Sequence, residues 1–334
     1  MSDLHRNLQQ KLVNQIKASI PHNVSLVEEL ADLLGISTDS VYRRLRCETE
    51  FTLNEVALVS EKFKIPVNLF LPDSVGSVSF SYDLLDNNQG FHQYLLSILK
   101  VMQTLRQTSN SEVIYAAIDI PIFHHFSSQL MIHFKAFYWM KEVVNLPDFQ
   151  GKKFEGELDN PLIEEITKEI YKVYAEIPST EIWTEDSVNS TLKQIEFYWE
   201  SGQFAEKKLA LNLCYEFTKI MNAIEKQAES SLKVYQGQRG QPATYTLYSS
   251  DIEIGNNCIL TKQNNTATTY LSFQTFNKLS TTSPAFAEQT QVWINNLIKK
   301  STMISGSAQK QRYKFFRKIY DKIHKLQQMI ENYE

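Results

Sequence analysis

A single glycine separates two short predicted helices in the stretch SLVEELADLLGISTDSVYRRLR, residues 25–46, and this feature constrains the fold more than any other. Ser25 followed by Glu28 predicts a capping box, in which each side chain accepts an unpaired backbone N–H at the start of a helix. Gly35 predicts the end of that helix, because only glycine takes the left-handed conformation without a Cβ penalty. The stretch therefore predicts two helices joined by a tight turn.

The second of these helices, expected over about residues 38–46 and capped by Ser37 or Thr38, has few positions to bury. Its inward residues are chiefly Val41 and Leu45. An independent surface helix usually buries a wider apolar stripe. We therefore expect this helix to be held by its neighbours and to present its polar side chains outward.

The pattern resembles the helix-turn-helix of phage-repressor-like (Cro or XRE-type) transcription regulators. The matching residues are Ala31 where the helices cross, Gly35 in the turn, Ile36 just after it and Val41 in the second helix. One position departs from the family pattern: Arg44 stands where an apolar residue is expected, and Leu45 follows it. The departure leaves the rotation of the second helix open by one position.

The residues downstream fit the rest of such a domain. In FTLNEVALVSEKFKIPVNLFL, Thr52 and Glu55 predict a second capping box, and Pro66 predicts the start of a short helix. With a first helix over about residues 4–20, the resemblance implies a five-helix DNA-binding domain over residues 1–73.

In this family the second helix lies in the major groove, with its N-terminal residues near the base edges. The resemblance therefore implies double-stranded DNA as partner, and two half-sites bound by a homodimer. The implied DNA-binding residues are Ser37, Thr38, Asp39, Tyr42 and Arg43 on bases, with Arg46 and Arg44 on phosphates. The net charge of −2 over residues 1–73 weighs against this reading. A head that docks onto another protein stays as an alternative.

Residues 74–90, which include most of DSVGSVS, predict a linker, and residues 91–334 predict a regulatory and dimerisation domain. The fold class is mainly α. Helices are expected over residues 91–106, 122–144, 161 onward, 184–202, 204–232, 283–300 and 307–332. Residues 244–273 alternate apolar and polar side chains between Asn-rich turns, which predicts a small antiparallel β-meander. The overall plan is similar to that of uncharacterised regulators of Bacteroidetes-type bacteria.

Two helical faces of the body each allow two interpretations. Ala210, Leu213, Phe217, Ile220 and Ile224 alternate spacings of three and four, which predicts the seam of a bundle or, less favoured, a short dimer contact. Residues 299–334 carry a net charge of +6, against −8 over residues 74–298. The basic last helix predicts either a second phosphate-contacting surface or a solvated face that pairs with the acidic middle region, and we favour the second.

Motifs that carry catalytic chemistry are absent from the sequence. GxGxxG, GxxxxGK[ST], HExxH and GxSxG do not occur, so we expect no enzymatic activity, no catalytic residues and no cofactor. His125 and His133 lie two helical turns apart, about 12 Å, too far to share a metal. We therefore interpret them, with His124, as packing residues and expect no metal site.

The remaining expectations concern location and ligands. The chain lacks a run of about 18 apolar residues, and its three cysteines follow no ligand spacing, so we expect a cytoplasmic protein with reduced thiols and no membrane contact. The aromatic-rich residues 123–140 allow a further alternative. In it, the body senses a small-molecule or peptide effector in an aromatic-lined pocket.

Overall fold

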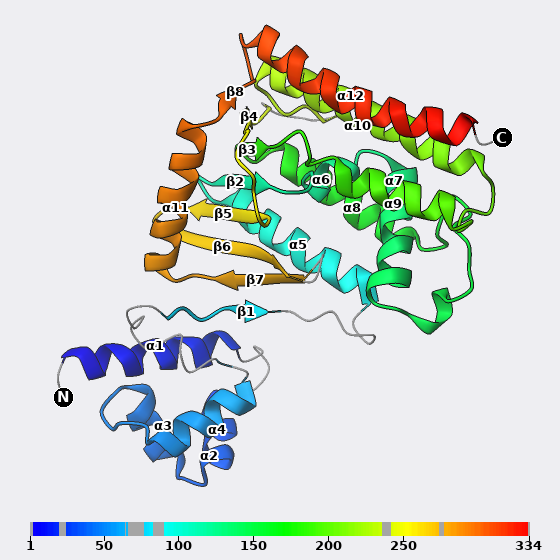
Figure 1. Cartoon of the computed structure of the whole chain (residues 1–334). Helices are drawn as coiled ribbons and strands as arrows, with labels where there is room; N and C mark the ends of the chain where they lie inside the picture. Colours follow the sequence, from blue (N-terminus) through cyan, green and yellow to red (C-terminus); the bar gives the residue numbers. More distant parts are fainter. Residues whose placement is uncertain are drawn as a thin grey trace. The chain divides into compact units, whose positions relative to one another are not determined.

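The computed structural model describes residues 3–19, 25–63, 65, 77–82, 90–235, 242–273 and 277–332. The chain divides into two compact units, residues 1–79 and residues 80–334, which we call the head and the body. Figure 1 traces the head in blue and the body from cyan to red. The linker predicted over residues 74–90 contains a strand, β1 (Ser81–Tyr82), which belongs to the body.

The head is helical. Its described helices are α1 (Asp3–Ser19), α2 (Leu26–Leu34), α3 (Thr38–Leu45) and α4 (Leu53–Phe63). Their buried apolar side chains form one small core: Leu12, Ile16, Leu30, Val41, Val59 and Ile65. These helices match four of the five that the sequence predicts. The fifth, expected from Pro66, lies outside the described residues.

The two predicted capping boxes of the head have different outcomes. Thr52 Oγ1 accepts the N–H of Glu55 at 3.3 Å, and Glu55 Oε2 accepts the N–H of Thr52 at 2.8 Å, so the second box is confirmed. Ser25 occupies the N-cap of α2, but its side chain makes no capping hydrogen bond, and the predicted box with Glu28 was wrong. Ser25 is exposed, so water can satisfy the first N–H groups of α2 instead.

The body is built on an eight-stranded sheet with the order β1-β7-β6-β5-β2-β3-β4-β8. The strands after β1 are β2 (Glu112–Ala117), β3 (Ser179–Trp183), β4 (Tyr245–Ser249), β5 (Cys258–Gln263), β6 (Thr266–Phe273), β7 (Asn277–Thr281) and β8 (Thr302–Met303). The three neighbouring strands β2, β3 and β4 are parallel, and all other pairs are antiparallel. Pairing therefore changes direction at β2 and again at β4.

Helices cover both faces of this sheet. The helix α11 (Pro284–Lys299) packs on one face, and a larger helical layer packs on the other (Figure 1). The helices of that layer are α5 (Gly90–Gln107), α6 (Ile122–His125), α7 (Gln129–Tyr138), α8 (Pro161–Ala175), α9 (Asn189–Glu200), α10 (Lys208–Ser230) and α12 (Gln309–Asn332). A π-helix (Trp139–Val143) and a 3-10 turn (Pro147–Phe149) follow α7.

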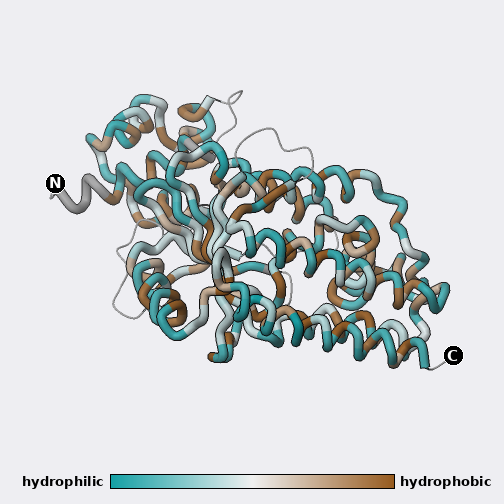
Figure 2. Tube along the Cα trace, turned by 90° about the horizontal axis from the view of Figure 1, so that it is seen from above, coloured by the Kyte–Doolittle hydropathy of each residue, from teal (hydrophilic) through white to brown (hydrophobic). Residues whose placement is uncertain are grey.

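The alternation of side chains along β2 shows why both faces must be covered. Val113 and Tyr115 point into the core under the helical layer, whereas Ile114 and Ala116 point toward α11. Such a strand, apolar on both sides, is typical of a parallel strand in a covered sheet. Helix α12, which ends at the C-terminus in Figure 2, alternates apolar and polar residues along its length and packs on α10.

The mainly α fold class with an antiparallel meander near the C-terminus is confirmed, and the structure enlarges the sheet. The meander consists of β5, β6 and β7. β4, which we expected within it, pairs instead with β3 and β8. β2 and β3 were not predicted. The seam on α10, including Leu213 and Phe217, is buried in the body core, as the bundle interpretation requires.

Several predicted helix bounds were wrong. The helix expected over residues 122–144 is broken between α6 and α7, where Ser128 caps α7 by accepting the N–H of Met131. The helix expected from Thr184 begins at Asn189, because the preceding residues form β3 and a turn. The helix expected from Phe204 begins at Lys208, because Phe204 instead pairs with Phe154 in a β-bridge.

Candidate functional site

The turn between α2 and α3 has the geometry that the sequence predicts. Gly35 is left-handed, with φ 63° and ψ 34°, and ends α2. Ser37 then caps α3, because its side chain accepts the N–H of Ser40 at 3.3 Å. The turn thus fixes where α3 begins and in which direction it leaves.

Contacts with the rest of the head fix the rotation of α3. Val41 is 1% exposed and Leu45 is half-buried. Arg44 lies on the same side: its Nη2 and Nε atoms contact the two carboxylate oxygens of Glu55 at 2.9 and 3.2 Å, and both side chains are 14% exposed. The arginine that replaces the expected apolar residue therefore anchors α3 to α4 by a two-point ion pair.

Glu55 serves the cap of α4 and the anchor of α3 at the same time. Burial acts to raise the pKa of Glu55, but the hydrogen bonds from Thr52 and Arg44 together with the Arg44 charge outweigh it, and the pKa is lowered. The carboxylate is therefore ionised at neutral pH. The sequence predicted that Thr52 and Glu55 cap a helix, but it did not predict that either residue affects α3.

The C-terminal end of α3 is also fixed. Cys47 is left-handed (φ 58°), and the N–H groups of Cys47 and Glu48 donate to the carbonyls of Arg44 and Arg43 at 2.9 and 2.8 Å, which forms a Schellman motif. The buried Gln9 of α1 donates to the carbonyls of Arg44 and Thr49 at 3.0 and 2.7 Å. These contacts hold the C-terminal end of α3, as the Ser37 cap holds its N-terminal end.

The other residues implied as DNA contacts share one property, which is exposure to solvent. They are Ser37, Thr38, Asp39, Tyr42, Arg43 and Arg46. Tyr42 is 52% exposed. Arg46 makes an exposed ion pair with Glu48 at 3.2 Å, whereas the guanidinium of Arg43 has no partner among the described residues. Arg43 is thus free to reach outward, and Arg44 is not.

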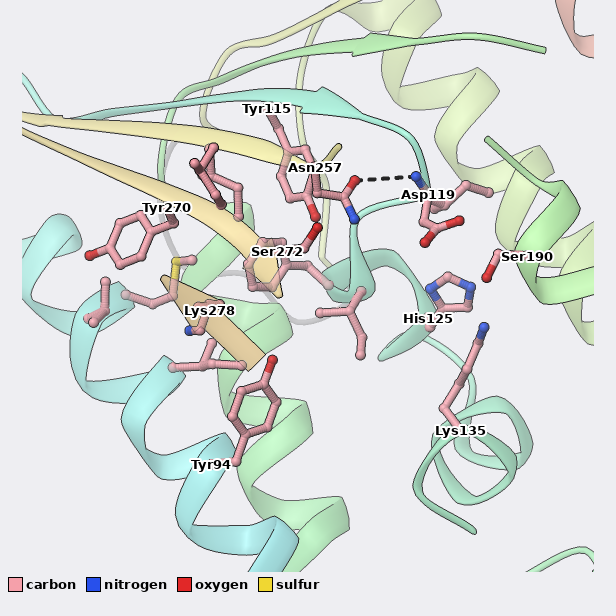
Figure 3. A pocket seen from close by; sticks show the side chains of 18 of the residues that line it. Tyr94, Tyr115, Asp119, His125, Lys135, Ser190, Asn257, Tyr270, Ser272 and Lys278 are labelled. Atoms are coloured by element: carbon pink, nitrogen blue, oxygen red, sulfur yellow. Dashed lines mark hydrogen bonds between the residues drawn. The ribbon is translucent and has the colours of Figure 1, made fainter. Parts of the chain in front are cut away.

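The body contains a second candidate site, a cavity of about 130 Å³ on the helical face of the sheet. It lies among β2, β5, β6 and the helices α5, α6, α7 and α9. Figure 3 shows a polar end, where Asp119, His125, Lys135 and Ser190 converge, and an aromatic end with Tyr94 and Tyr270. The sequence analysis expected residues 123–140 to supply aromatic side chains to a pocket. Of that stretch only Phe123, His125 and Lys135 line this cavity, and its tyrosines come from other elements.

Lys135 is the most unusual residue of the polar end. Its Nζ donates to Thr191 Oγ1 at 2.8 Å and to Gln194 Oε1 at 2.7 Å. Burial lowers the pKa of Lys135 to about 7, although the Asp119 charge opposes this. Burial, with the Lys135 charge, also lowers the pKa of His125 well below its usual value. His125 is therefore neutral, and its Nε2 shares a hydrogen bond with the Thr191 hydroxyl at 3.1 Å.

A different buried cluster surrounds Glu181 of β3, which is fully buried. Both carboxylate oxygens contact His124 Nε2, at 2.9 and 3.0 Å, and the hydroxyls of Tyr174 and Tyr245 also donate to Glu181. Burial acts to raise the pKa of Glu181, but His124 and Tyr174 lower it overall. Both oxygens of this carboxylate therefore have hydrogen-bond partners, and these partners join β3 to α6, α8 and β4.

The three histidines weighed as metal ligands have separate partners. His124 contacts Glu181, His125 contacts Thr191, and His133 contacts Glu164 at 3.0 Å. Within the described ranges, no group of three or more metal-binding side chains occurs. No helix in the described part of the chain is long and apolar enough to cross a membrane.

The head and its exposed α3 define a helix-turn-helix unit of the DNA-binding class. Residues 8–87 match the family model of the BetR domain, a helix-turn-helix-like DNA-binding family. The match covers the described helix-turn-helix and extends to β1. No curated protein and no solved structure matches the chain. The match supports a DNA-binding regulator.

Proposed function

We propose that the chain is a sequence-specific transcription regulator of the repressor-like (XRE) type that places α3 in the major groove of double-stranded DNA as a homodimer in the cytoplasm. The observation that carries this proposal is the asymmetry of α3. One side is anchored by Val41 and by the Arg44–Glu55 pair, and the other side exposes polar side chains to solvent. A displayed polar helix with fixed ends suits base readout.

The roles within α3 follow from this rotation. Ser37, Thr38 and Asp39 lie at the N-terminal end, where base edges are closest, and Tyr42 and Arg43 lie one turn further along. Arg43 has the fork that pairs with guanine O6 and N7. Arg46 lies at the C-terminal end and suits a phosphate. Arg44 leaves the contact set and acts as a positioning residue, because Glu55 occupies its guanidinium.

The experiment that tests this proposal is selection of bound sequences from a random DNA pool with the full-length protein. We expect a palindromic consensus, and a mass of two chains for the complex in light scattering. Arg43→Ala should relax the choice at one base pair per half-site, and Arg46→Ala should reduce the salt slope of binding by about 1 per chain. Lys11→Ala, which removes an exposed charge on α1, is the matched control.

The net charge of the head, −2, favours a second candidate function, in which α3 docks onto a protein. The two candidates differ in salt dependence, since phosphate contacts release counterions and protein docking does not. If no DNA sequence is enriched and Arg43→Ala leaves weak DNA affinity unchanged, the protein-docking function replaces the DNA-binding one.

For the body we propose dimerisation and sensing of an effector, without catalysis. The cavity at Lys135 supports sensing, because it combines apolar walls with a small set of fixed polar groups. Limited proteolysis and thermal unfolding of the full chain, with and without candidate effectors, test this part independently of DNA.

A further inference from the structure

The cavity in the body lies where ligand sites of sheet proteins commonly lie. It is next to the carboxyl end of β2, one of the two strands that pair in parallel on one side and antiparallel on the other. Open sheets with parallel strands tend to bind ligands outside the carboxyl ends of those strands. Asp119 lies two residues after the end of β2, and Ser190, Thr191 and Gln194 come from the first turns of α9.

The polar end of the cavity holds a buried lysine amino group that lacks an ionic partner. Lys135 is 7% exposed, and its two hydrogen bonds go to neutral oxygens of Thr191 and Gln194. An ammonium has three donors, so one remains available. Across the described residues, no carboxylate lies within ion-pair distance of Lys135. Buried charges are normally paired, so a bound anion would stabilise the charged form of Lys135 and complete this site.

A carboxylate faces the same end of the cavity from another element. Asp119 shares a hydrogen bond with Ser190, and its backbone N–H donates to Asn257 Oδ1 at 3.2 Å. Figure 3 shows Asp119, Ser190 and Lys135 around one space. The two opposite charges are each held by their own neighbours and do not contact each other. Their natural complement is a molecule that carries both charges on adjacent atoms.

The other end of the cavity is apolar and aromatic. Ile98 and Met102 of α5 face Ile259 of β5, and the rings of Tyr94 and Tyr270 lie beyond them. Lys278 lies 5.4 and 5.8 Å from the centres of these two rings. The volume of about 130 Å³ is that of the whole cavity, its polar end included, and is of the order that holds one benzene ring. The apolar end therefore has room for one apolar side chain at most.

We propose that the cavity binds a free amino acid with an apolar or aromatic side chain. Its carboxylate contacts Lys135, its ammonium contacts Asp119, and its side chain lies between Ile98, Ile259 and the Tyr94 ring. The inference deepens the sensing role proposed for the body and rests on it, and it does not depend on DNA binding.

The surroundings of the cavity favour a zwitterion over a plain carboxylic acid. A wider open hollow of about 870 Å³ shares Asp119, Ser190 and Gln194 with the cavity. Its charged lining residues are Asp119, Glu185, Asp186, Asp251, Glu253 and Lys193. Lys318 and Lys322 pair with Glu185 and Asp186, but an excess of negative charge remains. Such an entrance attracts an ammonium and repels a molecule that is only anionic.

The test measures thermal unfolding and calorimetric binding of the full-length protein without DNA. The probes are leucine and phenylalanine, their acids without the amino group (4-methylpentanoate and 3-phenylpropanoate), and their amines without the carboxylate (isopentylamine and phenethylamine). We expect at least one amino acid to raise the melting temperature, and both of its analogues to bind at least about tenfold more weakly. If neither amino acid binds, or if an analogue binds equally well, the inference is overturned.

Two variants assign the charges. In Lys135→Met, the amino acid should bind no more tightly than the amine that lacks the carboxylate. In Asp119→Asn, it should bind no more tightly than the acid that lacks the amino group. Lys141→Met is the matched control, since Lys141 is an equally buried lysine whose partners are Lys152 and Gln203, outside the cavity. Selectivity unchanged in both variants contradicts the proposed placement. The analogue series on the unmodified protein stays decisive even where a variant fails to fold.

The DNA selection described above is run on the same preparation. Amino-acid binding without DNA enrichment leaves the cavity assignment intact and overturns the DNA-binding proposal. DNA enrichment without amino-acid binding leaves the DNA-binding proposal intact and overturns the cavity assignment. The two failures are therefore distinguishable.

Discussion

At the scale of single residues, the adjacent arginines of α3 lie in different surroundings. Arg43 is exposed without a described partner, and Arg44 is bound to Glu55 through two contacts. A one-residue difference along a helix rotates a side chain by about 100°, which is enough to move it from the outer face to the packed one. Under the proposed function, the same side-chain chemistry serves base recognition at Arg43 and positioning of α3 at Arg44.

Arg44→Ala should destabilise the head, and Arg43→Ala should not. The first change leaves the half-buried Glu55 without its cation, so we expect a loss of about 1 kcal/mol in the free energy of unfolding. Urea titrations followed by a head-specific probe measure the difference. A double-mutant cycle with Glu55→Gln gives the coupling energy, and a coupling near zero would contradict the anchoring role.

Lys135 predicts a pH dependence of body stability. Its pKa is lowered from 10.5 to about 7 in the folded state, so the unfolded state binds more protons between these values. The contribution of Lys135 to the free energy of unfolding therefore increases as the pH rises from about 7 to 10.5. Lys135→Met should reduce the slope of unfolding free energy against pH by up to about 1.4 kcal/mol per unit. Urea titrations at pH 7.5 and 9 measure this slope, and an unchanged slope would show that Lys135 stays charged.

At the scale of elements, the turn between α2 and α3 depends on one backbone conformation. Gly35 has φ 63°, and a Cβ added there would meet no atom within 4 Å. The cost of a side chain is therefore conformational rather than steric. We expect Gly35→Ala to lower head stability by about 1 kcal/mol and Gly35→Asn by less. Thermal unfolding measures both, and a larger loss for asparagine would argue against this cause.

The sequence predicted α2, the turn and α3 well because their determinants are local. Gly35 and Ser37 act on neighbouring residues, and Val41 shows its burial by spacing. The Arg44–Glu55 pair could not be predicted, because it joins residues eleven apart whose packing depends on how α3 and α4 cross. β2 and β3 were missed for a related reason. They are short runs without alternation, since both faces are buried, and only the sheet distinguishes them from helix.

The polar residues of the cavity were even harder to predict from the sequence. Lys135 stands in the apolar run QLMIHFKAFY, where an isolated lysine is a signal that could have marked a buried polar site. Its partners Thr191 and Gln194 lie more than fifty residues away on α9. Nothing in the local sequence pairs these positions. The candidate site in the head was therefore predictable in outline, and the candidate site in the body was not.

At the scale of the whole molecule, the basic helix α12 is tied to the body by its own charges. Lys318 contacts Glu185 at 2.6 Å, Lys322 contacts Asp186 at 2.7 Å, and the buried Arg312 donates to the carbonyls of Ile304 and Gly306. These contacts agree with the interpretation that the helix pairs with the acidic middle region.

We therefore expect the exposed cations of α12 to add little to DNA binding. Replacing Lys310, Lys314, Arg317 and Lys325 together by glutamine should change DNA affinity by less than about twofold and leave the salt slope unchanged. Fluorescence anisotropy at several salt concentrations measures both quantities, with Arg46→Ala as the comparison. A tenfold loss with a shallower slope would give α12 a phosphate-contacting role.

The strand β1 has a consequence for where the body begins. Ser81 and Tyr82 pair with Ser280 and Leu279 of β7, and the neighbouring Phe80 ring packs edge-on against Phe286 of α11 at 5.2 Å. An outermost strand with unpaired N–H and C=O groups is a template for aggregation, and a short covering strand blunts it. A fragment started at residue 91 would strip this cover from β7 and invite strand-to-strand association between molecules. Fragments of the body meant to stay monodisperse should therefore begin before Phe80.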